Sequence, residues 1–73
     1  MKLTKREEEV FDNIREGISD TSQLRAFTQF DLDQIKEILV RLEDLNLITL
    51  ERSFDRVYNE DFWNAKLNEG ILK

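Results

Sequence analysis

The side chains that most often carry out catalysis are scarce in this chain. There is no histidine and no cysteine, so the commonest general base and the usual zinc ligands are missing. The carboxylates are numerous but scattered, and the single tyrosine, Tyr58, has no base to activate it. The two glycines, Gly17 and Gly70, form no glycine-rich loop that would cradle a phosphate. We therefore expect no enzyme, no catalytic residue, no metal and no cofactor.

The balance of charged residues bears on the class of binding partner. Lysine and arginine number 11 against 16 aspartate and glutamate residues, which gives a net charge of −5. This acidic balance opposes indiscriminate binding to nucleic acid, because phosphate contacts supply most of that affinity.

The length and composition indicate one small domain over residues 1 to 73. Hydrophobic residues make up 40% of the chain, which is enough for one compact core. The N-terminus lacks the apolar stretch of a signal peptide, and no run approaches the length of a membrane span. A cytoplasmic location is the default expectation, with no membrane partner.

Two helices are predicted in the first part of the chain from capping residues. Thr4 and Glu7 have the spacing of a capping box, and the helix that follows should cover about residues 5 to 16. Asp20 opens a short second helix that ends near residue 28. The side chains expected to face inward in this second helix are Leu24 and Phe27.

The third helix has the clearest pattern and should cover about residues 32 to 45. The cap lies at Asp31 to Gln34, and the apolar stripe consists of Ile35, Ile38, Leu39, Leu42 and Leu45. At 100° per residue, the side chains that point away from this stripe are Asp33, Lys36, Glu37, Val40 and Asp44, with Gln34 and Arg41 on one flank.

A hairpin and a last helix complete the expected order. Residues 48 to 52 alternate as a strand, Ser53 to Asp55 can turn, and residues 56 to 58 can return as a second strand. Asn59 can cap a final helix at about residues 60 to 69. The expected fold class is mainly α with a small β-hairpin, in the order helix, helix, helix, hairpin, helix.

This order of elements resembles the winged helix-turn-helix family, over roughly residues 4 to 58. The ending Leu42-Glu43-Asp44-Leu45-Asn46-Leu47-Ile48 is similar to that of the family's third helix, and Leu24, Phe30 and Ile35 stand at its buried positions. The stretch Glu51 to Tyr58 resembles a shortened MarR-type wing. Gln29 and Asn46 stand where the family has glycine, so the resemblance implies a left-handed backbone at both positions.

The resemblance implies a transcription regulator that binds double-stranded DNA with its third helix in the major groove. The DNA-binding residues it implies are Asp33, Gln34, Lys36, Glu37, Val40, Arg41, Arg52 and Arg56. Gln34 would read adenine, Lys36 or Arg41 would read guanine or grip phosphate, and the two wing arginines would grip phosphate.

Two alternatives stay open. The outward face of the third helix carries more acid than base, so this helix could instead engage a basic protein partner, with Leu32 and Val40 adding an apolar patch. The final helix could build a homodimer or simply complete the core. Its candidate contact residues are Phe62, Trp63 and Leu67.

Overall fold

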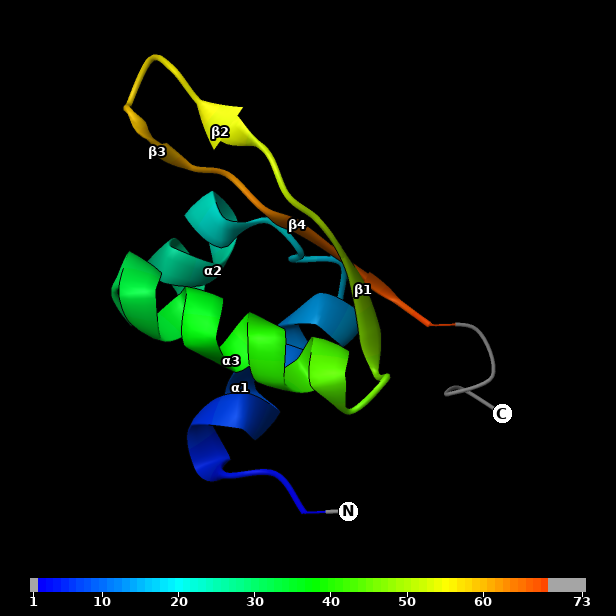
Figure 1. Cartoon of the computed structure of the whole chain (residues 1–73). Coiled ribbons are helices and arrows are strands. Elements are labelled where there is room, and N and C mark those ends of the chain that lie inside the picture. Colours follow the sequence, from blue (N-terminus) through cyan, green and yellow to red (C-terminus); the bar gives the residue numbers. More distant parts are fainter. Residues whose placement is uncertain (1, 69–73) are drawn as a thin grey trace.

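The computed structural model describes residues 2–68 as three helices followed by a long antiparallel hairpin (Figure 1). The helices are α1 (Lys5–Arg15), α2 (Thr21–Thr28) and α3 (Leu32–Asp44). The strands are β1 (Ile48–Glu51), β2 (Phe54–Asp55), β3 (Glu60–Asp61) and β4 (Asn64–Leu67). The three predicted helices are therefore confirmed, and within residues 2–68 none is long and apolar enough to cross a membrane.

The helices begin where capping side chains satisfy backbone N–H groups. The Thr4 hydroxyl accepts from the backbone N–H of Glu7, whose carboxylate accepts from the N–H of Thr4, so α1 starts with a complete capping box. Asp31 and Gln34 form the same reciprocal pair at α3. Asp20 caps α2 by accepting a backbone N–H three residues on.

The helices end at residues with positive φ, as the sequence suggested. Gly17 follows α1 with a φ of 99°, while Gln29 and Asn46 follow α2 and α3 at 64° and 62°. Asparagine tolerates this left-handed region, whereas a glutamine there costs on the order of 1 kcal/mol. The fold accepts that cost at Gln29 to make the tight turn between α2 and α3.

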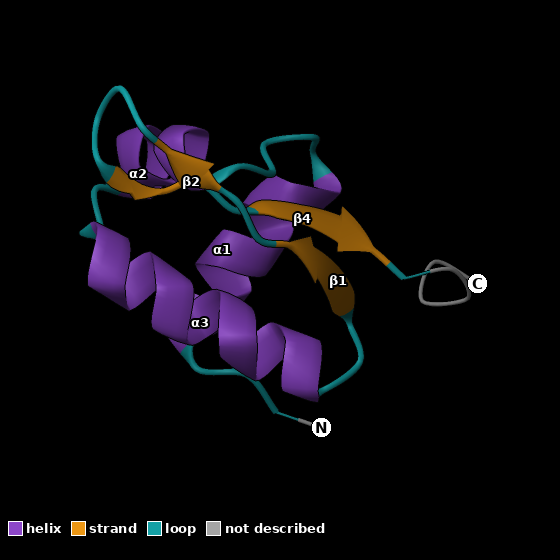
Figure 2. Cartoon of the chain, turned by 45° about the horizontal axis from the view of Figure 1, so that its top comes forward, coloured by secondary structure: helices purple, strands orange, loops and turns teal. Residues whose placement is uncertain are grey.

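The core lies between the helices and the inner face of the hairpin. The largest share comes from α3, which contributes four buried side chains, and α1, α2, β1 and β4 supply the rest. Figure 2 shows β1 and β4 next to α1 and α3. The buried apolar residues are Val10, Ile14, Leu24, Ile35, Ile38, Leu39, Leu42, Ile48, Leu50 and Ala65. The predicted stripe of α3 is confirmed apart from Leu45, which is only half-buried.

The hairpin keeps a single register along its whole length. Ile48 pairs with Leu67 in β1 and β4, and Phe54 pairs with Asp61 in β2 and β3, so no bulge separates the two short sheets. Backbone hydrogen bonds from Phe62 to Ser53 and from Asn68 to Leu47 belong to the same ladder. Residues 52 and 63 therefore face each other directly.

The segment that precedes α2 ties the hairpin to the helices. Asp20 forms an isolated antiparallel bridge with Asn64, and the backbone N–H of Ala65 donates to the Ser19 carbonyl at 2.8 Å. Thr21 and Trp63 exchange two further bonds, one between backbones and one from the Trp63 N–H to the Thr21 hydroxyl. These bonds also satisfy Thr21, a buried polar side chain.

The predicted final helix and the predicted turn are wrong. Residues 60 to 67 form the returning side of the hairpin, and residue 69 lies outside the described part of the chain. The turn occupies residues 56 to 59 because the Asp55 carboxylate accepts the backbone N–H groups of Val57 and Tyr58. Asn59, expected to cap a helix, has a φ of 55° and completes the turn.

Phe27 is a second correction, because this side chain was expected to face inward and is 64% exposed. The buried side of α2 is formed by Thr21, Leu24 and Thr28. Phe27 lies about 60° from Leu24 around the helix, on the side away from Thr28, where no described element covers it.

Candidate binding surfaces on the third helix and the hairpin

Trp63 joins the hairpin to α3 through a cluster of charged side chains. Its ring lies 4.9 Å from the Arg52 guanidinium carbon and 5.2 Å from the Lys36 nitrogen, measured to the ring centroid. Such cation–π contacts contribute about 0.5–1 kcal/mol each at exposed sites. Arg52 and Trp63 meet because they are cross-strand neighbours that do not exchange backbone hydrogen bonds, the pairing in which side chains lie closest.

Each cation of this cluster also forms an ion pair. The Lys36 ammonium donates to the Asp61 carboxylate of β3, and the Arg52 guanidinium donates to both oxygens of Glu43 on α3, at 2.8 and 3.3 Å. We call Lys36, Glu43, Arg52, Asp61 and Trp63 the Trp63 cluster. Both cations were expected to contact DNA, and both are engaged within the protein.

The charge of the Glu43–Arg52 pair gives a pH prediction. The Arg52 hydrogen bond, helped by the backbone N–H of Leu50, lowers the pKa of Glu43 below its ordinary value of 4.5 and raises that of Arg52. A carboxyl group whose pKa is lowered in the folded state stabilises that state at pH values above its ordinary pKa. This contribution is lost as the pH falls through the lowered pKa.

We therefore expect Glu43→Gln to lower the urea midpoint slightly near pH 7 and to have no such effect at an acid pH below the lowered pKa of Glu43, where the wild-type carboxyl group is itself protonated. Urea titrations of both proteins at the two pH values measure this. An unchanged difference between them at low pH would contradict the assignment.

Gln34 and Arg41, on the opposite flank of α3, are engaged as well. The Gln34 carbonyl closes the capping box with Asp31, so it is not free to read a base. The Arg41 guanidinium lies 3.6 Å from the Glu7 carboxylate of α1. The sequence did not identify Glu7, Glu43 and Asp61 as partners because each pair joins two elements whose relative placement is set only by the tertiary structure.

Arg56 differs from the other predicted cations. It lies in the exposed turn of the hairpin and forms no ion pair with any carboxylate in residues 2–68. The predicted set Lys36, Arg41, Arg52 and Arg56 therefore does not converge on one basic surface. Three of its members are neutralised locally, and the fourth stands apart at the tip.

The outward face of α3 is left acidic as a result. Asp33, Glu37 and Asp44 are exposed, and none of them has an ion-pair partner in the described part of the chain. Val40 lies among them and is half-buried. We call these four residues the acidic face.

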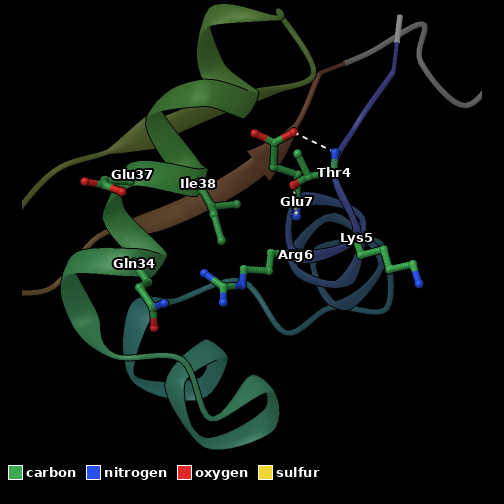
Figure 3. Close-up of a pocket in the computed structure, with 7 residues that line it drawn as sticks. All are labelled: Thr4, Lys5, Arg6, Glu7, Gln34, Glu37 and Ile38. Carbon is green, nitrogen blue, oxygen red and sulfur yellow. Dashed lines mark hydrogen bonds between the residues drawn. The ribbon is translucent and has the colours of Figure 1, made fainter.

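A hollow of about 540 Å³ lies between α1 and α3, beside the acidic face (Figure 3). Ile38 and Arg6 point into it, whereas Lys5 and Glu37 extend outward at its rims. We call it the α1–α3 hollow. Its lining residues are Thr4, Lys5, Arg6, Glu7, Gln34, Glu37 and Ile38. Residues 2–68 contain no group of three or more side chains suited to holding a metal ion.

The residues predicted to contact a dimer partner lie in the hairpin, since the helix that was to carry them is not formed. Trp63 belongs to the Trp63 cluster, Leu67 packs against the core, and Phe62 is 36% exposed. The alternation of Trp63, Ala65 and Leu67 with polar neighbours is the signal that would have identified this strand.

Comparisons with family models, curated proteins and solved structures find no match.

Proposed function

We propose that this chain is a winged-helix domain that binds a protein partner, with the acidic face of α3 as the contact surface for a basic segment. The observation that carries the proposal is the charge of that face. Within residues 2–68, three exposed carboxylates of this face form no ion pair, while the cations on both flanks of α3 are already paired.

The shape of the surroundings supports the same proposal. The hairpin is held on one flank of α3 by the Lys36–Asp61 pair, and α1 lies on the other flank through the Arg41–Glu7 pair. The acidic face thus runs between two fixed walls. A segment that presents lysine or arginine with an apolar side chain would meet the carboxylates and Val40 together.

Double-stranded DNA is the second candidate, and it is favoured by the order of the elements together with Arg56, which forms no ion pair with a carboxylate of residues 2–68. In a winged helix the wing reaches the DNA backbone, so Arg56 would contact phosphate. The acidic face of α3 opposes this function, because it would meet the phosphates of the groove with three negative charges.

Fluorescence anisotropy with two probes tests the proposal. One probe is a fluorescein-labelled peptide of lysine and leucine, and the other is a labelled mixed-sequence duplex at low salt. We expect the peptide to bind and to lose about tenfold in affinity in a triple variant of the acidic face, because each exposed ion pair contributes up to about 1 kcal/mol. The triple variant carries Asp33→Asn, Glu37→Gln and Asp44→Asn.

A matched control separates the acidic face from bulk charge. It removes two exposed carboxylates of α1 and that of its C-cap, none of which forms an ion pair in the described residues, and it carries Glu8→Gln, Glu9→Gln and Glu16→Gln. An equal loss of affinity in both variants would show that net charge alone attracts the peptide. Tight binding of the duplex, weakened by Arg56→Ala, would replace the proposal with the DNA function.

A further inference from the structure

The hairpin has one covered edge and one edge that no described strand pairs with. On the returning side, backbone hydrogen bonds join residues 63 and 65 to the segment 19–21 that leads into α2. On the other side, β1 pairs only with β4 and β2 only with β3 in the part of the chain that the structure describes. Figure 1 shows the returning strands between α2 and the strands β1 and β2.

This outer edge presents backbone groups that the fold does not use. The Phe62 N–H donates to the Ser53 carbonyl across the hairpin, and the backbone groups of successive residues point to opposite sides. The N–H and C=O groups of residues 52 and 54 therefore point to the outer edge, where no hydrogen bond within residues 2–68 reaches them. Lower down, the Leu50 N–H is already taken by the Glu43 carboxylate. We call residues 51 to 55 the open edge.

The spacing of these groups selects an extended segment as the occupant. Donors and acceptors that recur on alternate residues of a strand match the backbone of an added strand, which gains affinity from main-chain hydrogen bonds. A helix cannot pair with them, because its own backbone groups are used within the helix. Antiparallel addition is favoured, since antiparallel pairs are slightly more stable per residue than parallel ones.

The side chains of the open edge specify the chemistry of that segment. Glu51 and Asp55 lie on one face of the strand, and neither forms an ion pair within residues 2–68. Phe54 lies on the opposite face and is 55% exposed. Because side chains of an added strand alternate between the same two faces, lysine or arginine would lie opposite the carboxylates and a β-branched residue opposite Phe54.

The charges of the open edge oppose its pairing with a second copy of itself. In an antiparallel pair of copies, the register that joins residue 52 to residue 54 puts Glu51 opposite Asp55. The neighbouring registers put Arg52 opposite Arg52 or Arg56. Like charges directly opposite one another destabilise a pair of strands, so the edge fits a partner of different sequence.

We propose that the open edge binds an extended basic segment of another protein by antiparallel strand addition. The inference goes beyond the proposed function, because it uses no residue of the acidic face.

A labelled pentapeptide tests the backbone pairing by fluorescence anisotropy. Its residues are lysine, valine, threonine, threonine and lysine, so that the second and fourth lie opposite Phe54 and Arg52. N-methylation of these two residues should lower the affinity at least about tenfold, because it removes the N–H groups that point to the edge. N-methylation of the third and fifth residues is the matched control and should leave the affinity nearly unchanged, since these N–H groups point away from the edge.

Variants of the protein test the same contact from its other side. Phe54→Pro removes an N–H from the open edge, and Phe54→Ala is its control because it removes the ring and keeps the N–H. We expect the proline variant to bind the peptide more weakly than the alanine variant, with urea midpoints reported for both.

Charge reversal tests the specificity for a basic segment. Glu51→Lys should weaken binding about tenfold, whereas Glu8→Lys, the same change on α1, should have little effect. A peptide whose fifth residue is glutamate should recover affinity for the Glu51→Lys variant, because that residue lies opposite position 51.

Absence of peptide binding to the wild type would overturn the inference, and so would equal affinities of the two methylated peptides. An equal loss of affinity in the triple variant of the acidic face would place the peptide on α3 and would also overturn it. Conversely, binding that depends on the edge-facing N–H groups and is unchanged in the triple variant would uphold the inference, even if the lysine and leucine peptide of the proposed function does not bind.

Discussion

Leu39→Ala is expected to lower the free energy of unfolding by about 3 kcal/mol, the largest effect of any change considered for this chain. Leu39 lies at the centre of α3 and is fully buried within the cluster that joins the helices to β1 and β4. The substitution removes buried methyl groups and leaves a cavity that the close-packed surroundings fill only in part. For so small a domain, this is a large fraction of the total stability.

Urea unfolding followed by circular dichroism and by the fluorescence of Trp63 measures the loss. The matched control is Val57→Ala, which removes methyl groups from a side chain that is 85% exposed and should change the stability by less than about 0.5 kcal/mol. Similar urea midpoints for the two variants would mean that α3 does not pack its stripe into a common core.

Trp63→Ala is expected to lower the free energy of unfolding by about 2 kcal/mol and to destabilise the hairpin more than the helices. The ring is half-buried, packs against the core and lies between the Arg52 and Lys36 cations, so its removal leaves two ion pairs without their common support. Amide hydrogen exchange should accelerate most in the outer hairpin, residues 53 to 62, and least in α3.

Trp63→Phe is the control for this prediction, because a phenyl ring keeps an apolar and aromatic surface between the two cations. It should recover more than half of the lost stability and most of the amide protection. A uniform rise in exchange across the whole domain in Trp63→Ala would show instead that the ring supports the core in general and does not anchor the hairpin.

The three helices were predictable because their determinants are local. Thr4, Asp20 and Asp31 each cap the helix that follows through bonds within three residues, and Asn46 tolerates the left-handed backbone needed after α3. No information from distant parts of the chain was needed. The apolar stripe of α3 then specified which face turns inward.

The returning side of the hairpin was mispredicted because its strand conformation depends on pairing with β1, which is distant in the sequence. Asn59, Glu60 and Asp61 have the composition of a helix start, yet Ile48 and Leu50 need a strand opposite them that buries Ala65 and Leu67. The turn predicted from the sequence ends at Asp55 and therefore lies too early in the chain. In the structure Asp55 begins the turn, by accepting the N–H groups of the residues that follow it.

The position of the acidic face on α3 was predictable from the sequence, but the pairing of the nearby cations was not. The outward residues of α3 follow from helix geometry, and Asp33, Glu37 and Asp44 are exposed as expected. Whether Lys36, Arg41 and Arg52 are available depends on carboxylates brought in by β3, by α1 and by the end of α3 itself. Such pairings arise only once the tertiary structure sets the distances between elements.

The unbroken register of the hairpin restricts how its length can change by insertion or deletion. Because side chains alternate between the two faces, one residue added to either strand between positions 48 and 55 or 60 and 67 would turn Trp63 or Arg52 away from α3. Residues 56 to 59 lie beyond the last pair and escape this constraint. Longer and shorter versions of this arm are thus compatible with the same helical body, provided that the change in length falls at the tip or comes in matched pairs.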